Sequence, residues 1–184
     1  AIQLMMEIKG IRRLGFHFLP YACLVTYPPS ISSEKLHTNL LAFHLGNGAS
    51  LCAIHNEQSV AITIGYSPLD RLTMGTRSCG IDANAVLCRV EDNGLELTKA
   101  ILNHESGLLG LSGGKSDIRN LMLDPSADSA FAIEHFCYWS LRHAGSLIAT
   151  MEGVDAIAST GDIWETRFGC AHEFYGDLNR PECA

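Results

Sequence analysis

The middle of the chain alternates apolar runs with turn residues, and this pattern predicts three consecutive β-strands. Residues 40–45 form an apolar run bounded by turn residues, as expected for a buried strand. Residues 50–55 and 59–64 predict two further strands, and the tight connection at 56–58 makes them antiparallel neighbours. We therefore expect an antiparallel meander of three strands.

The second half of the chain predicts helices followed by one more strand. Residues 65–80 are rich in Gly, Pro, Thr and Ser and have no helical period, so they predict a long loop. Connections of that length are often functional. Asp82 and either Ser116 or Asp117 have side chains that cap helix N-termini. The predicted elements are, in order, helices at 83–90, 95–103 and up to residue 121, a mostly buried helix at 128–151, and a short strand at 154–159.

This order of elements predicts an α/β layered domain, because strands are followed by helices and a strand then returns after a long helix. In such domains, ligands bind where glycine turns follow the carboxyl ends of strands. Ahead of the domain, residues 1–10 predict the end of a helix, 11–16 a short strand and 27–33 a loop.

Composition and charge narrow the possible partners. The net charge of −7, from 13 basic and 20 acidic residues, argues against nucleic acid, which needs clustered Lys and Arg. No apolar run reaches the ~18 residues of a membrane span, and the N-terminus lacks a signal-peptide pattern. Seven cysteines without a CxxC pair predict reduced thiols rather than a zinc site. We expect a cytoplasmic protein with no membrane and no nucleic-acid partner.

The sequence HLGNGAS at 44–50 places Gly46, Asn47 and Gly48 directly after the first strand of the predicted meander. Two glycines let the backbone approach a ligand closely, and successive amides in such a turn form a nest for an anion. Asn47 adds a neutral donor for a phosphate oxygen. The same residues are typical of a plain hairpin turn, because Asn-Gly is a strong hairpin signal. Both interpretations stay open at this point.

Three other segments have side chains suited to phosphate or nucleotide chemistry. Arg77, inside the loop 75–78, has a planar guanidinium that pairs with phosphate at two points. His17 follows a predicted strand and can hydrogen-bond a phosphoryl group in either protonation state. Asp117 can accept from a ribose hydroxyl, and Arg119 can stack on a base. The structural alternatives are a solvated loop arginine, a structural histidine, and a capping aspartate in a surface ion pair.

The order of these motifs resembles the acetate and propionate kinase family. The motifs are, in chain order, HLGNGAS at 44–50, GYSPL at 65–69, MGTRS at 74–78, ESGLLGLSG at 105–113, SDIR at 116–119, a long helix, and STG at 159–161. They extend over most of the chain, from about Gly10 to Thr160. The resemblance implies an incomplete actin-like ATPase domain, the α/β fold of acetate and sugar kinases, Hsp70 and actin, which is ribonuclease H-like.

The resemblance also implies a chemistry and a set of site residues. Members of the family transfer a phosphoryl group between ATP or ADP and a short carboxylate, acetate or propionate, with Mg²⁺, and work as homodimers. By resemblance, His17 and Arg77 stabilise the phosphoryl group in flight, and Phe16 and Pro68 line the pocket for the acyl methyl group. The implied nucleotide-binding residues are His44, Gly46, Asn47, Gly48, Asp117, Ile118, Arg119 and Gly161. In such a reaction, the protein mainly positions groups and neutralises charge.

The resemblance divides the chain into three parts. Residues 1–38 are expected to be an interdomain remnant that carries the GFH motif, residues 39–167 the nucleotide-binding C-terminal domain, and residues 168–184 a divergent tail. Asp162 and Trp164 replace glycines of the family's adenosine loop, and the N-terminal domain of the family has no counterpart. The alternative function is therefore a non-catalytic nucleotide-binding or dimerisation remnant of such a kinase.

Overall fold

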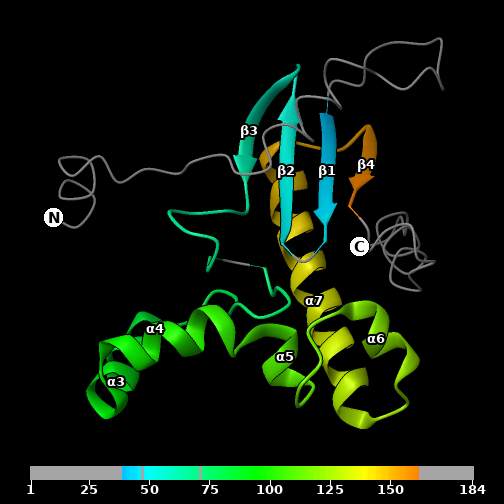
Figure 1. Ribbon diagram of the computed structural model, residues 1–184. Helices are drawn as coiled ribbons and strands as arrows, with labels where there is room; N and C mark the ends of the chain where they lie inside the picture. The colour runs from blue at the N-terminus through cyan, green and yellow to red at the C-terminus, as the bar shows by residue number, and fades with distance from the viewer. Residues whose placement is uncertain (1–38, 47, 71, 162–184) are drawn as a thin grey trace, which may run out of the picture.

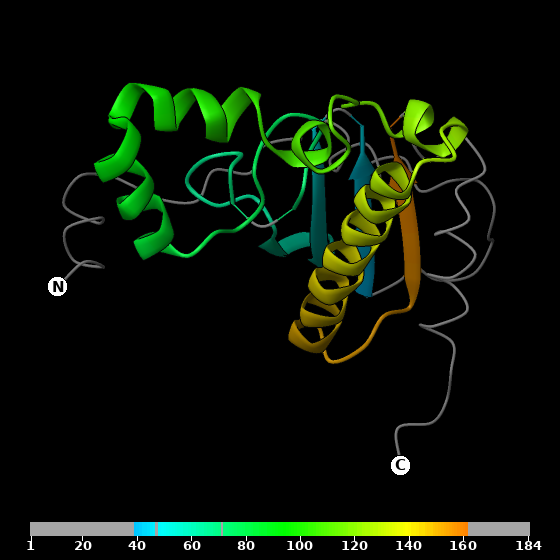
Figure 2. The ribbon, with the colours of Figure 1, turned by 90° about the horizontal axis from the view of Figure 1, so that it is seen from below.

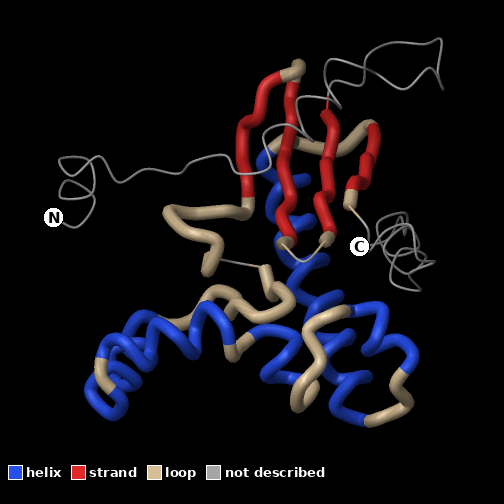
Figure 3. Tube along the Cα trace, viewed as in Figure 1, coloured by secondary structure: helices blue, strands red, loops and turns tan. Residues whose placement is uncertain are grey.

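The computed structural model describes residues 39–46, 48–70 and 72–161 of the chain (Figure 1). The elements predicted before residue 39 and the tail after residue 161 lie outside these residues and stay predictions. Strands occupy one half of the described part, and most helices occupy the other half (Figure 3). The predicted α/β class is confirmed.

A mixed sheet of four strands has the order β3-β2-β1-β4. Its strands are β1 (Asn39–Leu45), β2 (Ala49–His55), β3 (Gln58–Ile62) and β4 (Ala156–Thr160). β2 pairs antiparallel with both β1 and β3, so the predicted meander is confirmed, whereas β4 pairs in parallel with β1. Because parallel strands end on the same side, the carboxyl ends of β1 and β4 meet at one edge of the sheet.

Two strand boundaries differ from the prediction by two residues, and at each of them a side chain takes part in the pairing. β3 ends just before Thr63, whose hydroxyl accepts from the Leu51 amide at 2.9 Å where a longer strand would offer a backbone carbonyl. β4 begins just after Asp155, whose carboxylate accepts from the Asn39 amide at 2.8 Å. Side-chain bonds of this kind compete with the backbone ladder of a sheet.

The helices lie close to the predicted positions, with one exception. They are α3 (Ala83–Asn93), α4 (Leu95–His104), α5 (Gly107–Leu111), α6 (Ile118–Leu123) and α7 (Ala127–Thr150). Asp82 and Asp117 accept from backbone amides at the starts of α3 and α6, so both aspartate caps are confirmed. The sequence predicts no helix at α5, because glycine weakens a helix. Hydrogen bonds to a preceding loop, described below, hold this segment in place.

α7 crosses one face of the sheet, and the main core lies between the two (Figure 2). Leu41 of β1 packs in this core with Phe136 and Leu147 of α7. Phe131 and Tyr138, on the same helix, are 54% and 58% exposed. The prediction of a mostly buried helix is therefore correct for one face of α7 and wrong for the other.

The state of the cysteines and the length of the helices test two further expectations. Cys52, Cys79 and Cys88 are free thiols, whereas Cys137 is disulfide-bonded. The prediction of reduced cysteines is thus confirmed for the first three and wrong for Cys137. None of the helices in the described ranges has the length and apolar content that a bilayer crossing needs.

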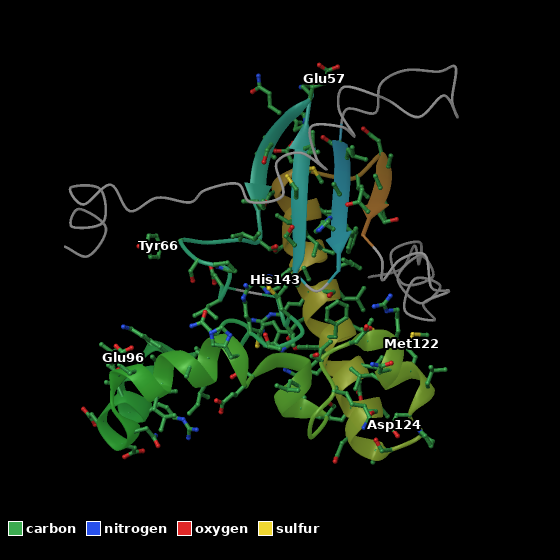
Figure 4. The ribbon with its side chains drawn as sticks, viewed as in Figure 1. Glu57, Tyr66, Glu96, Met122, Asp124 and His143 are labelled. Carbon is green, nitrogen blue, oxygen red and sulfur yellow. The ribbon has the colours of Figure 1, made fainter. Side chains whose placement is uncertain are left out.

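Asp124 joins the end of α6 to the start of α7, at the end of the molecule remote from Glu57 (Figure 4). Its carboxylate accepts from the hydroxyls of Ser126 and Ser129 at 2.5 Å each and pairs with the Lys115 ammonium at 2.9 Å. These bonds, above all the one from Ser126, hold the pKa of Asp124 well below its ordinary value. A carboxyl group whose pKa is lower in the folded protein than in the unfolded chain stabilises the fold. This stability is fully present above the pKa of the unfolded chain, and it is lost as the pH falls from there through the pKa of the folded protein.

We expect Asp124→Asn to lower the urea denaturation midpoint at pH 7. The difference from wild type shrinks as the pH falls below about 4, because Asp124 of the unfolded wild-type chain then takes up a proton while the folded carboxylate, with its lowered pKa, is still ionised. Asp128→Asn is the control, since Asp128 is an exposed residue in the first turn of the same helix. A difference between Asp124→Asn and wild type that stays constant between pH 7 and pH 2.5 would contradict this role.

Candidate functional site

The carboxyl ends of β1 and β4 point toward the half of the molecule that holds α5 and α6, and each strand continues into a glycine (Figure 1). Gly161 follows β4 with φ of 96°, a region that favours glycine. A Cβ at Gly161 would collide with the carbonyl group of Leu45, the last residue of β1. The backbone after β4 therefore lies directly against the strand that leads into Gly46.

The glycine turn, residues 46–48, closes the hairpin between β1 and β2. The Gly46 amide donates to the Gly48 carbonyl at 3.1 Å, next to the paired residues Leu45 and Ala49. The hairpin interpretation thus describes the connection correctly, and it is compatible with an anion nest, which uses amides of the same turn. A Cβ on Gly46 would have the Gly48 oxygen at 3.7 Å as its neighbour among the described atoms. Asn47 lies outside the described residues.

His44 connects β1 to β4 beside this glycine turn. It lies opposite Thr160 in the parallel pairing, and its Nδ1 is 3.0 Å from the Thr160 hydroxyl. That hydroxyl donates to the Phe43 carbonyl at 3.3 Å, so its oxygen accepts from Nδ1 of His44. The bond fixes the orientation of the half-buried imidazole at the edge where the glycine segments meet.

Arg77 belongs to residues 72–78, called the arginine loop here, which the segment 102–109 holds by its backbone. Amides donate from Ser78 to Leu102, from Ser106 to Thr76, from Leu108 to Met74 and from Leu109 to Gly75, at 2.9–3.0 Å. Gly107 lies at the centre of this segment with φ of 63°. A Cβ on Gly107 would collide with the carbonyls of Met74 and Arg77. The loop is therefore held in one conformation, unlike a freely solvated loop.

The side chains at the tip of the arginine loop have few partners within the part of the chain that the structure describes. Arg77 is half-buried, and its Nη1 has a weak contact with Sδ of Met74 at 3.9 Å. The hydroxyl oxygen of Ser78 is buried and has no hydrogen-bond partner among the described residues. A buried hydroxyl left unpaired costs about 1–3 kcal/mol, which a bound ligand can offset. This tip is therefore suited to contact an anion.

Pro68 lies in the turn between β3 and the arginine loop. The Leu69 amide donates to the Ser67 hydroxyl at 3.3 Å, which shapes the turn around the half-buried proline. A Cβ on Gly65 would collide with the carboxylate of Asp70, so the two ends of this turn lie against each other. Tyr66 points outward in the same segment (Figure 4) and is 62% exposed.

Asp117 and Arg119 form the helix cap and the surface ion pair that the sequence leaves open as the structural alternative. Asp117 caps α6, and its carboxylate accepts from the Arg119 guanidinium at two atoms, with Nη2 to Oδ2 at 2.6 Å. This bidentate pair lowers the pKa of Asp117. Ile118 is 1% exposed in the main core. The Ile118 side chain is therefore a core residue, and a contact with a nucleotide at this position has to come from its backbone.

One core supports the glycine turn, the arginine loop and α6. Leu45 before the glycine turn, Met74 in the arginine loop, and Ile118 in α6 belong to the same buried cluster. His17 and Phe16 lie outside the described residues, so their predicted roles stay predictions. Across the described ranges, His, Cys, Asp and Glu side chains form no group of three or more that could hold a metal ion.

Gly107 is the position that the sequence does not single out, although it lies within the ESGLLGLSG motif. Its role comes from contact with a loop about thirty residues earlier in the chain, and a single sequence shows no such contact. The one local signal is the Ser-Gly pair directly before a short apolar run, which marks a turn rather than a buried junction.

Glycines that follow neighbouring parallel strands, beside a loop that presents a held arginine, are typical of α/β domains that bind nucleotide phosphates. The comparisons with known proteins agree with this class. The model of the acetokinase family matches residues 2–179, and the chain belongs to that family. The matched range includes part of the predicted tail at 168–184, whose limits stay a prediction.

The relatives of the chain are acetate and propionate kinases. Acetate kinase from Rickettsia typhi is 42% identical over 158 residues, which are 84% of this chain and 41% of that protein. The crystal structure of Porphyromonas gingivalis acetate kinase matches with a TM-score of 0.87 at 29% identity, over 95% of this chain and 45% of that chain. A propionate kinase from Francisella tularensis matches with a TM-score of 0.83 at 27% identity, over 95% and 46%. The chain thus spans less than half the length of these relatives, with a fold consistent with an incomplete actin-like ATPase domain.

Proposed function

We propose that this chain is the nucleotide-binding part of a phosphotransferase that moves a phosphoryl group between ATP and a short carboxylate, acetate or propionate, to give an acyl phosphate. The observation that carries the proposal is the contact between Gly161 and Leu45, which joins the two glycine segments at one sheet edge. Membership of the acetokinase family supports the choice of reaction.

Each candidate residue has a part in this proposal. Arg77, together with His17, neutralises the charge on the phosphoryl group in transfer, and Phe16 and Pro68 line a small apolar pocket for the acyl methyl group. The proposed nucleotide contacts come from His44, Gly46, Asn47, Gly48, Asp117, the backbone of Ile118, Arg119 and Gly161. Arg119 has to leave its pair with Asp117 if it is to stack on a base.

Mg²⁺ fits this part of the chain poorly, because the described residues contain no group of acidic or histidine side chains that could surround it. Mg²⁺ commonly binds through substrate phosphates and keeps several waters. We therefore propose that the ion enters with ATP or ADP, and that no described side chain forms its cage.

The proposal includes a homodimer and a cytoplasmic location. Leu87 of α3, and Leu95 and Leu97 of α4, are 49–59% exposed, which supports a further protein contact at this end of the molecule. Sedimentation equilibrium tests the dimer directly, and a single species at the mass of one chain would contradict it.

Calorimetric titration with Mg²⁺-ATP tests whether the chain binds a nucleotide. We expect binding, and we expect Gly46→Ala to weaken it by about tenfold or more while the denaturation midpoint is unchanged. The reason is that the protein leaves room for a methyl group at Gly46, with its described neighbour at 3.7 Å, whereas a phosphate against the turn would meet it. Gly145→Ala on α7, where a Cβ has open space, is the matched control.

A hydroxamate assay for acyl phosphate then separates the two candidate functions. Acyl phosphate above the blank supports the kinase reaction in this chain. Nucleotide binding without acyl phosphate supports the alternative, a non-catalytic nucleotide-binding or dimerisation module. Affinity for Mg²⁺-ATP that is equal in wild type and Gly46→Ala would contradict the role of the glycine turn.

A further inference from the structure

A chain of hydrogen-bonded side chains joins α7 to the start of the arginine loop. Thr73, which is 1% exposed and lies four residues before Arg77, has its hydroxyl 3.2 Å from Nδ1 of His135. On the other side of the same ring, the Trp139 indole Nε1 donates to Nε2 of His135 at 3.1 Å. The imidazole thus lies between a loop hydroxyl and an indole of its own helix.

The chemistry of the indole determines the protonation of His135. An indole N–H is a donor only, so Nε2 of His135 accepts and has no proton. The proton of the neutral ring is then on Nδ1, where it donates to the Thr73 hydroxyl. We propose that His135 is a positioning residue, a neutral imidazole that holds the start of the arginine loop against α7. This inference builds on the role proposed for Arg77.

The surroundings of His135 favour the neutral ring. Burial lowers the pKa of His135 below its ordinary value of 6.5. The Arg142 guanidinium lies 4.7 Å from the Trp139 ring centroid. The His143 ring stacks on the same indole, with the two ring centroids 5.7 Å apart. Arg77 follows in the loop that contacts His135. Glu134, the residue next to His135 in α7, is exposed. Burial is therefore the cause that favours the neutral ring.

This contact complements the hold on the loop from segment 102–109. That segment bonds the backbone of residues 74–78, whereas His135 bonds a side chain just before them. Figure 4 shows His143 of the same helix between the sheet and the lower helices, where α7 passes from one half to the other. Protonation of His135 places an N–H on Nε2 directly against the indole N–H of Trp139, and it places a charge in a half-buried site. The ring then has to turn away from Trp139, which loosens its contact with Thr73 and the start of the loop.

Hydrogen exchange at the amides of Leu108 and Leu109 reports on the loop, because these amides donate to Met74 and Gly75. We expect His135→Ala and Thr73→Val each to speed this exchange by about tenfold, the usual effect of one lost hydrogen bond. The double variant should be no faster than either single variant, because both remove the same contact. The Glu105 amide donates to the Ile101 carbonyl at the end of α4 and not to the arginine loop, so its exchange rate should stay unchanged.

Three comparisons make the test decisive on the full chain. Thr150→Val, which removes an exposed hydroxyl near the end of α7, is the matched control and should leave the exchange unchanged. His135→Asn, which keeps an N–H donor near the Nδ1 position, should restore most of the protection. Wild-type exchange, corrected for its intrinsic pH dependence, should rise as the pH falls through the lowered pKa of His135, and that rise should be absent in Thr73→Val.

Several results would overturn the proposal. The first is that the increases in exchange rate from Thr73→Val and His135→Ala multiply in the double variant. The second is that the variants speed the exchange of all amides equally. The third is that the corrected exchange rate of wild type does not depend on pH. If His135→Ala does not fold, the comparison of Thr73→Val with Thr150→Val decides alone. The exchange readout needs no nucleotide, so a failure of the proposed kinase reaction and a failure of this inference are distinguishable.

Discussion

Replacing Arg77 with alanine is expected to reduce acyl phosphate formation by about 10³-fold, the effect of removing an arginine that neutralises a phosphoryl group in transfer. The affinity for Mg²⁺-ATP should change much less, because the charge that Arg77 meets is greatest in the transition state. The measurement is the hydroxamate assay on the full chain, with calorimetric titration of Mg²⁺-ATP alongside.

Arg77→Lys separates charge from shape. Lysine keeps the positive charge but loses the planar fork that meets two oxygens at once, so it should restore only a small part of the rate. Arg89→Ala is the matched control, because Arg89 is exposed on α3 and its side chain lies on the surface. An Arg77→Ala variant as active as Arg89→Ala would show that the guanidinium has no part in the reaction.

The strands and the long helix were predictable because their signals are local. The apolar runs before Gly46 and after Asn56 indicate strands wherever they occur, and Asp82 and Asp117 cap the helices that follow them. The short boundary errors come from side chains such as Thr63, which pair with the backbone of a neighbouring strand. The pairing partner of a side chain is a property of the fold and is invisible in the local pattern.

The candidate site was only partly predictable, for the same reason. The glycine turn and Arg77 are visible in the sequence because glycine pairs and loop arginines have recognisable chemistry. Neither the contact of Gly161 with Leu45 nor that of His135 with Thr73 has a sequence signal, since each joins residues more than sixty positions apart. Ile118 is a different case, because its side chain lies in the core, so its proposed contact with a nucleotide is left to its backbone.

The second large effect is expected at Gly107. Gly107→Ala adds a Cβ that collides with the carbonyls of Met74 and Arg77, and it also forces alanine into a φ of 63°. Together, the overlap and the backbone strain should lower the free energy of unfolding by about 3 kcal/mol. The arginine loop should shift as well, so the variant should lose acyl phosphate formation at temperatures where it is still folded.

Gly113→Ala separates the two causes, because Gly113 has a φ of 68° but open space around the added methyl group. It should cost only about 1 kcal/mol, the strain alone, and leave the reaction unchanged. Urea denaturation gives both free energies, and hydrogen exchange at Leu108 reports whether the loop has moved, since that amide bonds to Met74. Equal losses in the two variants would mean that the contact between Gly107 and the loop adds nothing. A larger loss at Gly107, with faster exchange at Leu108, would show that this glycine fixes the position of the loop that carries Arg77.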